Sequence, residues 1–206
     1  MNTPRDLLII ALEVASDRPP GRGDLSLALA GAELIDLLEA RAARLRDEYV
    51  VPGDNRAVGE RLLDEASASL ARQEPFETIE DWLWRRGRGL ADVYLTALGS
   101  EGLITQQRRF RRLPFVTGRT VPADTPARRS ALERWTADEP VLATLGAAVG
   151  IRDEPPEGAP EVADEVADEA VATVLDAVHD ALRDLEAERQ KRSIEQAAFD
   201  NVWRGP

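Results

Sequence analysis

The sequence predicts a mainly α-helical single domain built around one buried central helix, with one or two small β-hairpins. Three observations lead to this prediction. The stretch 24–38, which reads DLSLALAGAELIDLL, is apolar around most of a helix circumference. Several later stretches repeat apolar residues at helical spacing. Strand-like composition is confined to short stretches near residues 49–51 and 103–119.

The central helix is predicted over residues 24–38, with Asp24 as its N-cap. Its later polar residues, Ser26, Glu33 and Asp36, fall on one narrow stripe at 3.6 residues per turn, so the rest of the circumference must be buried. The uncharged part, 25–32, is far shorter than the roughly 20 apolar residues of a membrane span. A helix inside a domain is therefore expected, and the small residues 30–32 should let a neighbour approach closely.

Shorter elements are predicted on both sides of this helix. They are a helix capped by Thr3 and reaching residue 14, a loop over 19–23, a strand at 49–51, helices over 58–73, 77–86 and 90–98, a hairpin over 103–119, a helix from Pro126, and helices over 141–149 and 161–192. Arg41, Arg44 and Arg46 are expected to close the central helix, because cations favour a helix C-terminus. The aromatic segment 199–203 is expected to fold back onto the body.

Length and charge favour one domain spanning residues 1–206, with an acidic linker near 153–160. The chain carries 26 basic and 38 acidic residues, a net charge of −12. That average hides two opposite regions. Residues 85–134 contain eleven arginines and four acids, whereas residues 153–188 contain thirteen acids and one arginine. A strongly basic middle is therefore expected on a molecule whose total charge opposes nucleic-acid binding.

The composition provides few of the residues that common enzyme reactions use. Cysteine is absent, and the one histidine, His179, is expected at an exposed ion-pairing position on an acidic helix. No spacing typical of a metal site, a nucleophilic serine or a phosphate-binding loop occurs. We expect no catalytic residue, metal, cofactor or enzyme activity. The absence of cysteine, and an apolar run at 7–12 too short for a signal peptide, favour a cytoplasmic location.

Arginine is the residue type from which a binding site is predicted. It clusters in three segments of the basic middle, and a compact fold should bring at least two of them together. The clusters are Arg85, Arg86 and Arg88, then Arg108, Arg109, Arg111 and Arg112, then Arg128 and Arg129. Guanidinium groups suit phosphate, and the aromatic residues Trp82, Trp84, Phe110 and Phe115 suit a membrane interface. The alternative, equally open, is that these arginines pair with the acidic C-terminal helix.

Arg22 is a further candidate for binding an anion. The loop 19–23 places it beside the positive end of the central helix, where backbone donors and a guanidinium converge. Simple solvation of Arg22 is the alternative.

The order of several segments resembles the Golgi phosphoprotein 3 family, in particular its bacterial branch. The matching segments are DLLIIALEV, LALAGAELIDLLEARAARL, LLDEASASL, ETIEDWL, GSEGLIT, the hairpin, ARRSALERW and AFDNVWRG. The resemblance implies a helical domain around a buried helix, in a peripheral membrane protein that binds phosphatidylinositol 4-phosphate or a similar acidic lipid. It also implies an adaptor for protein clients, and a hairpin, here Arg108 to Arg119, that serves self-association and membrane contact.

The lipid pocket that this resemblance implies is largely rewritten in the present chain. Gly21 stands where eukaryotic members have a tryptophan, and Ala30 where they have an arginine. Of two further pocket arginines, one falls on Arg88 and the other on Ala91.

These observations predict a non-enzymatic, cytoplasmic protein that docks peripherally on an anionic phospholipid surface through the region 85–134. The predicted phosphate contacts are Arg22, Arg85, Arg86 and Arg88, and the predicted membrane or oligomerisation hairpin contains Arg108, Arg109, Phe110, Arg111, Arg112 and Phe115. One alternative is a scaffold that oligomerises through the hairpin. Another is a winged-helix-like regulator linked to DNA, which the acidic residue Asp92 on the preceding helix opposes.

Overall fold

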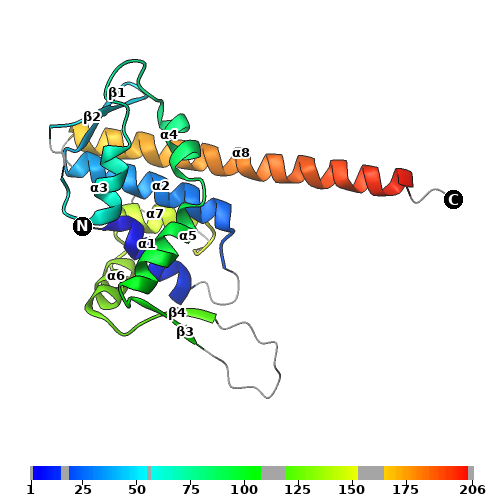
Figure 1. Cartoon of the computed structure of the whole chain (residues 1–206), viewed down its shortest axis with the longest axis horizontal. Coiled ribbons are helices and arrows are strands. Elements are labelled where there is room, and N and C mark those ends of the chain that lie inside the picture. The colour runs from blue at the N-terminus through cyan, green and yellow to red at the C-terminus, as the bar shows by residue number, and fades with distance from the viewer. Residues whose placement is uncertain (1, 15–18, 55–56, 108–118, 153–164, 204–206) are drawn as a thin grey trace.

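The computed structural model describes residues 2–14, 19–54, 57–107, 119–152 and 165–203. Within these ranges the chain forms eight helices and two small antiparallel sheets, which confirms the mainly α-helical prediction (Figure 1). The elements are α1 (Thr3–Glu13), α2 (Arg22–Glu39), β1 (Ala43–Arg46), β2 (Tyr49–Pro52), α3 (Arg61–Ala68), α4 (Ile79–Arg86), α5 (Leu90–Ser100), β3 (Ile104–Gln107), β4 (Arg119–Pro122), α6 (Pro126–Thr136), α7 (Pro140–Ala148) and α8 (Glu165–Trp203).

Helix α2 is the centre of the fold. It contacts α1, α3, α4, α5, α7, α8 and β1, and every residue from Leu25 to Leu37 is buried. The predicted central helix is thus confirmed, and a side chain at Gly31 would collide with Val178 of α8, as its small residues led us to expect. The predicted start was wrong: the N-cap is Gly21, and Asp24 lies in the first turn.

The polar stripe of α2 is buried as well. Ser26 Oγ accepts a hydrogen bond from the Ala91 backbone N–H at 3.0 Å, and Asp36 Oδ2 accepts one from the Thr3 N–H at 2.8 Å. Glu33 is also fully buried. Buried polar groups are retained where they find partners, so this stripe connects α2 to α1, α4 and α5 instead of facing water.

Helix α1 packs against α2, α6 and α7 and is buried over most of its length. Proline occupies the first turns of α1, α6 and α7, where its missing N–H costs nothing. The N-cap of α1 is Asn2, whose side chain accepts from the Arg5 N–H at 3.0 Å, so the prediction of Thr3 as the cap was wrong by one residue.

The segment after α2 differs from the prediction. Helix α2 ends at Glu39, Arg41 adopts a left-handed φ of 55°, and Arg44 and Arg46 lie in β1 rather than in a helix. Strand β1 pairs with β2 in the register Ala43↔Pro52 to Arg46↔Tyr49. Pairing with the predicted strand at 49–51 therefore outweighed the favourable position of these cations at a helix end.

The predicted second hairpin has paired strands at its base. Strands β3 and β4 pair from Ile104↔Pro122 to Gln107↔Arg119. Its tip, residues 108–118, lies outside the described residues, as does the predicted linker 153–160.

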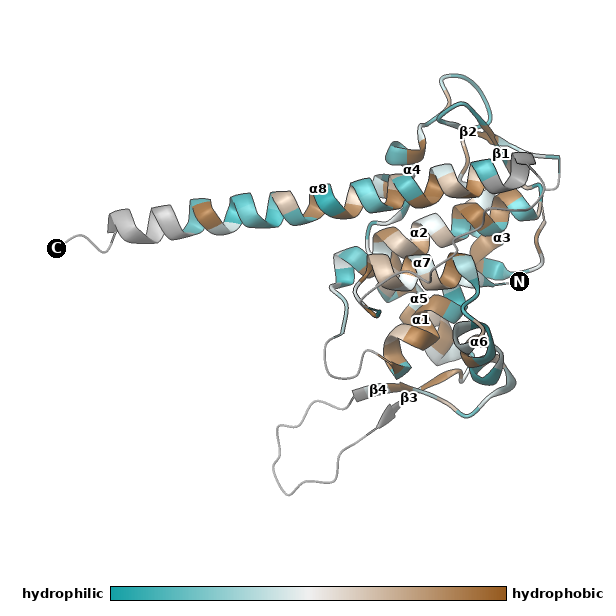
Figure 2. Cartoon of the chain, turned by 180° about the vertical axis from the view of Figure 1, so that it is seen from behind, coloured by the Kyte–Doolittle hydropathy of each residue, from teal (hydrophilic) through white to brown (hydrophobic). Residues whose placement is uncertain are grey.

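Helix α8 begins alongside α2, α4 and α7 and then leaves the body (Figure 1). Val174, Val178, Ala181 and Leu182 bury its inner face. Beyond that contact the helix is coloured mainly hydrophilic and projects on its own (Figure 2). The predicted return of residues 199–203 was wrong, because the helix continues without a break to Trp203.

Asp36 should give the stability of the protein a distinct dependence on pH. Burial raises the pKa of its carboxyl from 3.8 to about 6, although the hydrogen bonds from Thr3 oppose the shift. Between these values the folded state holds a proton that the unfolded chain has released. The free energy of unfolding should therefore fall by about 3 kcal/mol as pH rises from about 4 to about 6, and this contribution should be constant above that.

Asp36→Asn does not titrate, so it isolates this contribution. Urea unfolding at pH 4 to 7.5 should show the variant gaining stability relative to the wild type up to about pH 6, with no further gain above. A difference that does not change with pH would contradict the assignment.

Candidate functional site

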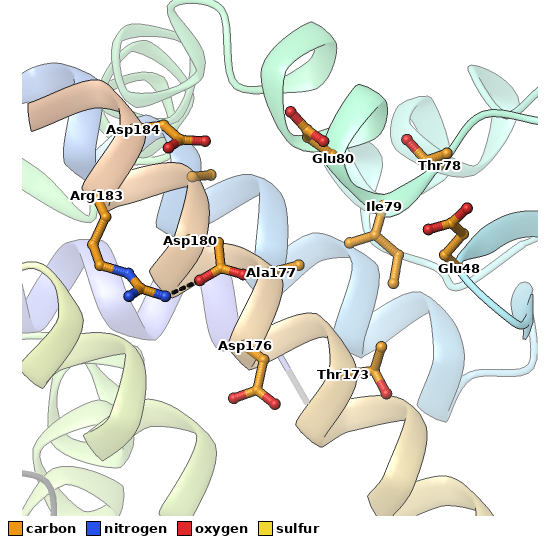
Figure 3. A pocket seen from close by; sticks show the side chains of 11 residues that line it. Glu48, Thr78, Ile79, Glu80, Thr173, Asp176, Ala177, Asp180, Arg183 and Asp184 are labelled. Carbon is orange, nitrogen blue, oxygen red and sulfur yellow. Dashed lines mark hydrogen bonds and ion pairs between the residues drawn. The ribbon is translucent and has the colours of Figure 1, made fainter. Parts of the chain in front are cut away.

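Two hollows on the surface differ sharply in charge. The larger one, about 630 Å³, lies between α8 and the start of α4, and we call it the acidic groove. Figure 3 shows its carboxylates, with a single arginine, Arg183, reaching to Asp180. They belong to Glu48, Glu80, Asp176, Asp180 and Asp184. No group of three such side chains that could hold a metal ion occurs in the described parts of the chain. The acidic groove therefore has the wrong sign for a phosphate.

The second hollow has a volume of about 260 Å³ and brings together two of the predicted arginines. It is formed by the start of α2, the connection from α4 to α5, and one residue of α8. We call it the arginine hollow. Its lining residues are Arg22, Gly23, Ser26, Leu27, Trp84, Gly87, Arg88, Gly89, Asp92 and Leu185.

Two helix N-termini open at the arginine hollow. Gly21 caps α2 without a side-chain hydrogen bond, and the residues that follow, Arg22 and Gly23, line the hollow. Gly89 caps α5 at a left-handed φ of 67°, a conformation that favours glycine. The first N–H groups of a helix lack intrahelical acceptors and carry partial positive charge. Both helix ends therefore add to the attraction for an anion.

The charged side chains of the arginine hollow are solvent-accessible. Arg22 donates to Asp92 Oδ1 in an ion pair whose side chains are 67 % and 68 % exposed. Arg88 is exposed and forms no ion pair with any other residue that the structure describes. At the edge, Arg189 of α8 donates to both carboxylate oxygens of Asp24, at 2.8 and 2.9 Å. Arg88 is thus the cation most available to a ligand.

The other two predicted phosphate contacts are engaged within the protein. Arg85 donates twice to Glu77, at 2.9 and 2.6 Å, and lies 5.2 Å from the ring centroid of Trp82. Arg86 turns inward and donates twice to Glu33, at 2.7 and 2.9 Å. Of the four predicted phosphate contacts, Arg22 and Arg88 therefore line one hollow. Arg85 and Arg86 instead bind carboxylates of the protein itself.

Glu33, Arg86 and Tyr94 form a buried network that the sequence did not indicate. The Glu33 side chain is 0 % exposed and that of Arg86 17 %. Tyr94 donates its hydroxyl to Glu33 Oε1 at 3.0 Å. Burial raises the pKa of the Glu33 carboxyl, while the hydrogen bonds and charge of Arg86 oppose that rise. Burial and the neighbouring Glu33 charge also raise the pKa of Tyr94. The network holds the end of α4 and the body of α5 against α2.

The predicted convergence of the basic middle was wrong for its described arginines. On α6, Arg128 pairs with Glu13 of α1 at 2.6 Å, Arg129 with Asp124 at 3.0 Å, and Arg134 with Asp6 at 2.6 Å. Helix α6 lies at the far side of the body from α4 in both views (Figures 1 and 2). The alternative, pairing with the acidic C-terminal helix, was also wrong for these described arginines, because their partners lie in other elements.

The two described aromatic residues that were predicted at a membrane interface lie in different environments. Trp82 is fully buried and donates its indole N–H to the Ala30 carbonyl at 3.1 Å, so its predicted place at a membrane interface was wrong. Trp84 is half-buried and lines the arginine hollow. The hairpin residues Arg108, Arg109, Phe110, Arg111, Arg112 and Phe115 lie outside the described residues.

A third hollow also contains arginines. Arg44, Arg46 and Arg72 line it beside Phe76, next to β1 and β2. Arg46 pairs with Glu74 at 3.0 Å and stacks on Phe76, whereas Arg72 is exposed. No helix N-terminus is among its lining residues, so the arginine hollow remains the stronger candidate for binding an anion.

The sequence also matches a known protein family. The family model for Golgi phosphoprotein 3 (GPP34) matches residues 4–197. The chain belongs to this family. The match spans nearly all of the chain and confirms the resemblance inferred from its segments. No curated protein shows a significant match to this Golgi phosphoprotein 3 family member. In the described residues, no helix combines the length and apolarity needed to cross a bilayer.

Replacing Arg86 should destabilise the fold strongly. Arg86→Gln leaves the Glu33 carboxylate buried without its counter-charge, and removing one member of a buried ion pair costs about 3–5 kcal/mol. The matched control is Arg61→Gln, which removes an exposed i,i+4 pair with Glu65 and should cost less than about 1 kcal/mol. Urea unfolding followed by circular dichroism compares them. Equal losses in the two variants would show that the Glu33 network does not hold the core.

Proposed function

We propose that this protein is a non-enzymatic peripheral membrane protein whose arginine hollow binds the headgroup of an anionic phospholipid. A cytoplasmic location and reversible attachment to a membrane surface are part of the proposal. The observation that carries it is the meeting of Arg22 and Arg88 in one hollow at which two helix N-termini open.

The chemistry of this hollow fits a phosphate group. Guanidinium groups donate in a planar fork that matches phosphate oxygens, and backbone N–H groups at helix starts add further donors. Arg88 is free to reorient toward a ligand because no described residue pairs with it. Trp84, Leu27 and Leu185 supply an apolar wall beside these charges, as expected where a headgroup meets the bilayer interface.

The overall charge of the chain does not oppose this proposal. Its net charge is −12, but charge acts over a Debye length of about 8 Å at physiological ionic strength. A local pair of arginines therefore decides contact with a membrane more than distant carboxylates do. The acidic groove would instead limit attachment in other orientations.

Family membership supports the proposal and extends it to an adaptor that holds protein clients at a membrane. The ligand is proposed as an anionic phospholipid in general rather than phosphatidylinositol 4-phosphate. Gly21 provides no side chain for a further phosphate, and Ala30 is fully buried. Self-association through the hairpin tip remains a separate prediction.

Replacing the two arginines of the hollow should weaken attachment to anionic membranes. An arginine near an anionic surface contributes about 1 kcal/mol, so Arg22→Gln or Arg88→Gln alone should reduce binding about fivefold, and the double variant roughly thirtyfold. Flotation with vesicles of phosphatidylcholine, with and without anionic phospholipid, measures this effect. Binding of the wild type should also fall as salt is raised.

The matched control is Arg72→Gln. Arg72 is an exposed arginine of the third hollow, and its loss changes the net charge by the same amount. It should leave binding within about twofold of the wild type. An equal loss in Arg72→Gln and Arg88→Gln would assign attachment to diffuse charge, and no preference of the wild type for anionic vesicles at low salt would refute the proposal.

A further inference from the structure

We propose that the arginine hollow selects a phosphodiester lipid with a hydroxylated headgroup, of the phosphatidylglycerol class, and that Asp92 determines this selectivity. The inference rests on the headgroup binding proposed above. It follows from the presence of one carboxylate among the two arginines of the hollow.

The side chains of the arginine hollow carry a net positive charge. Arg22 and Arg88 contribute two positive charges to the lining, and Asp92 contributes one negative charge. Arg189 at the edge is neutralised by Asp24. The side chains of the hollow therefore present a net charge near +1. A phosphodiester carries one negative charge, whereas a phosphomonoester carries about −1.5 to −2 at neutral pH. The net side-chain charge therefore equals that of the diester in magnitude, and the partial positive charge of the two helix starts adds to the attraction for either ligand.

Asp92 also offers hydrogen-bond acceptors to a ligand. An ionised carboxylate only accepts hydrogen bonds, with about four acceptor positions on its two oxygens. Oδ1 of Asp92 accepts from Arg22, and no donor in the described parts of the chain reaches Oδ2, which is therefore open to a donor on the ligand. Ionised phosphate oxygens have no hydrogen to donate and would be repelled, but a hydroxyl on the headgroup would be bound. Asp92 therefore favours a polyol ester over an extra phosphate.

A second polar group in the hollow can donate to a ligand. The Ser26 hydroxyl is buried and accepts from the Ala91 N–H at 3.0 Å, while none of the described residues accepts its own hydrogen. It is therefore available to donate to a phosphate oxygen. Ser26 and Arg88 can therefore donate to the phosphate, whereas Asp92 can accept from a hydroxyl of the headgroup.

The size of the hollow agrees with a small headgroup. Its volume of about 260 Å³ lies below the roughly 300–1,000 Å³ of typical small-molecule sites. A glycerol phosphodiester headgroup is small enough for this space, and its acyl chains would remain in the bilayer.

Asp92 also has a structural role that the test must separate from selectivity. It lies in the first turn of α5, where a negative charge stabilises the helix by a few tenths of a kcal/mol to about 1 kcal/mol. Losing that role would change binding to all lipids equally. The ratio of affinities for two lipids is not affected by it, so this ratio is the quantity to measure.

The experiment compares vesicles containing phosphatidylglycerol with vesicles containing phosphatidic acid, a phosphomonoester, at matched surface potential in phosphatidylcholine. The full-length wild type should bind the phosphatidylglycerol vesicles about fivefold more tightly. Asp92→Asn keeps the shape of the side chain and an acceptor for Arg22 but removes the charge. It should improve binding to phosphatidic acid about fivefold and so abolish the preference.

The matched control is Asp180→Asn in the acidic groove, which likewise removes an exposed carboxylate paired with an arginine. It should keep the wild-type preference. Equal binding of both lipids by the wild type, or the same ratio in Asp92→Asn and Asp180→Asn, would overturn the selectivity while leaving headgroup binding intact. Failure of the wild type to bind either anionic vesicle would overturn both proposals. Circular dichroism verifies that each variant is folded.

Soluble competitors separate a lipid headgroup from a free phosphate ion. Glycerophosphoglycerol, which is phosphatidylglycerol without its acyl chains, should displace the protein from vesicles at constant ionic strength. Equimolar inorganic phosphate should not. Displacement by phosphate alone would mean that the hollow takes the free ion, and the lipid assignment would then be wrong.

Discussion

The burial of the Glu33 charge is the constraint on which the rest of the structure depends. A carboxylate at the centre of α2 is costly to desolvate, so the fold must supply a counter-charge and donors inside the core. Arg86 at the end of α4 and Tyr94 in α5 do so. Their contacts hold the end of α4 and the body of α5 against α2. Because Arg88 follows Arg86 by two residues, the pair that neutralises the core also positions the cation of the arginine hollow at the surface.

Elements that local sequence patterns determine could be predicted, whereas pairings that depend on tertiary contacts could not. The central helix was evident because nearly all of its surface is apolar. The helix predicted over 58–73 is shorter in the structure, where it is α3. Local hydrogen bonds that periodicity does not indicate occur at its two ends: the Asp64 carboxylate accepts from the Val58 N–H at 2.6 Å, and Ser69 donates to the Ala66 carbonyl at 2.8 Å. Strand β1 was missed because its arginines have the composition of a helix end.

The candidate site shows the same division. Arg22 could be proposed from its place before a helix, and Arg88 from a family resemblance, but charge counting gave no means of distinguishing Arg88 from Arg86. Only the fold reveals that one guanidinium faces Glu33 and the other faces water. Asp92 was visible in the sequence as an acid in a basic region. Its position beside Arg22 depends on the packing of α5 against α2, which no local pattern encodes.

The projecting part of α8 has a consequence for how the molecule moves in solution. A helix of 39 residues is about 58 Å long, and its second half extends from the body without support. An elongated particle experiences more friction than a sphere of equal mass, so this chain should migrate early through a gel-filtration column. An apparent mass above the formula mass would then reflect the rod rather than association of several copies.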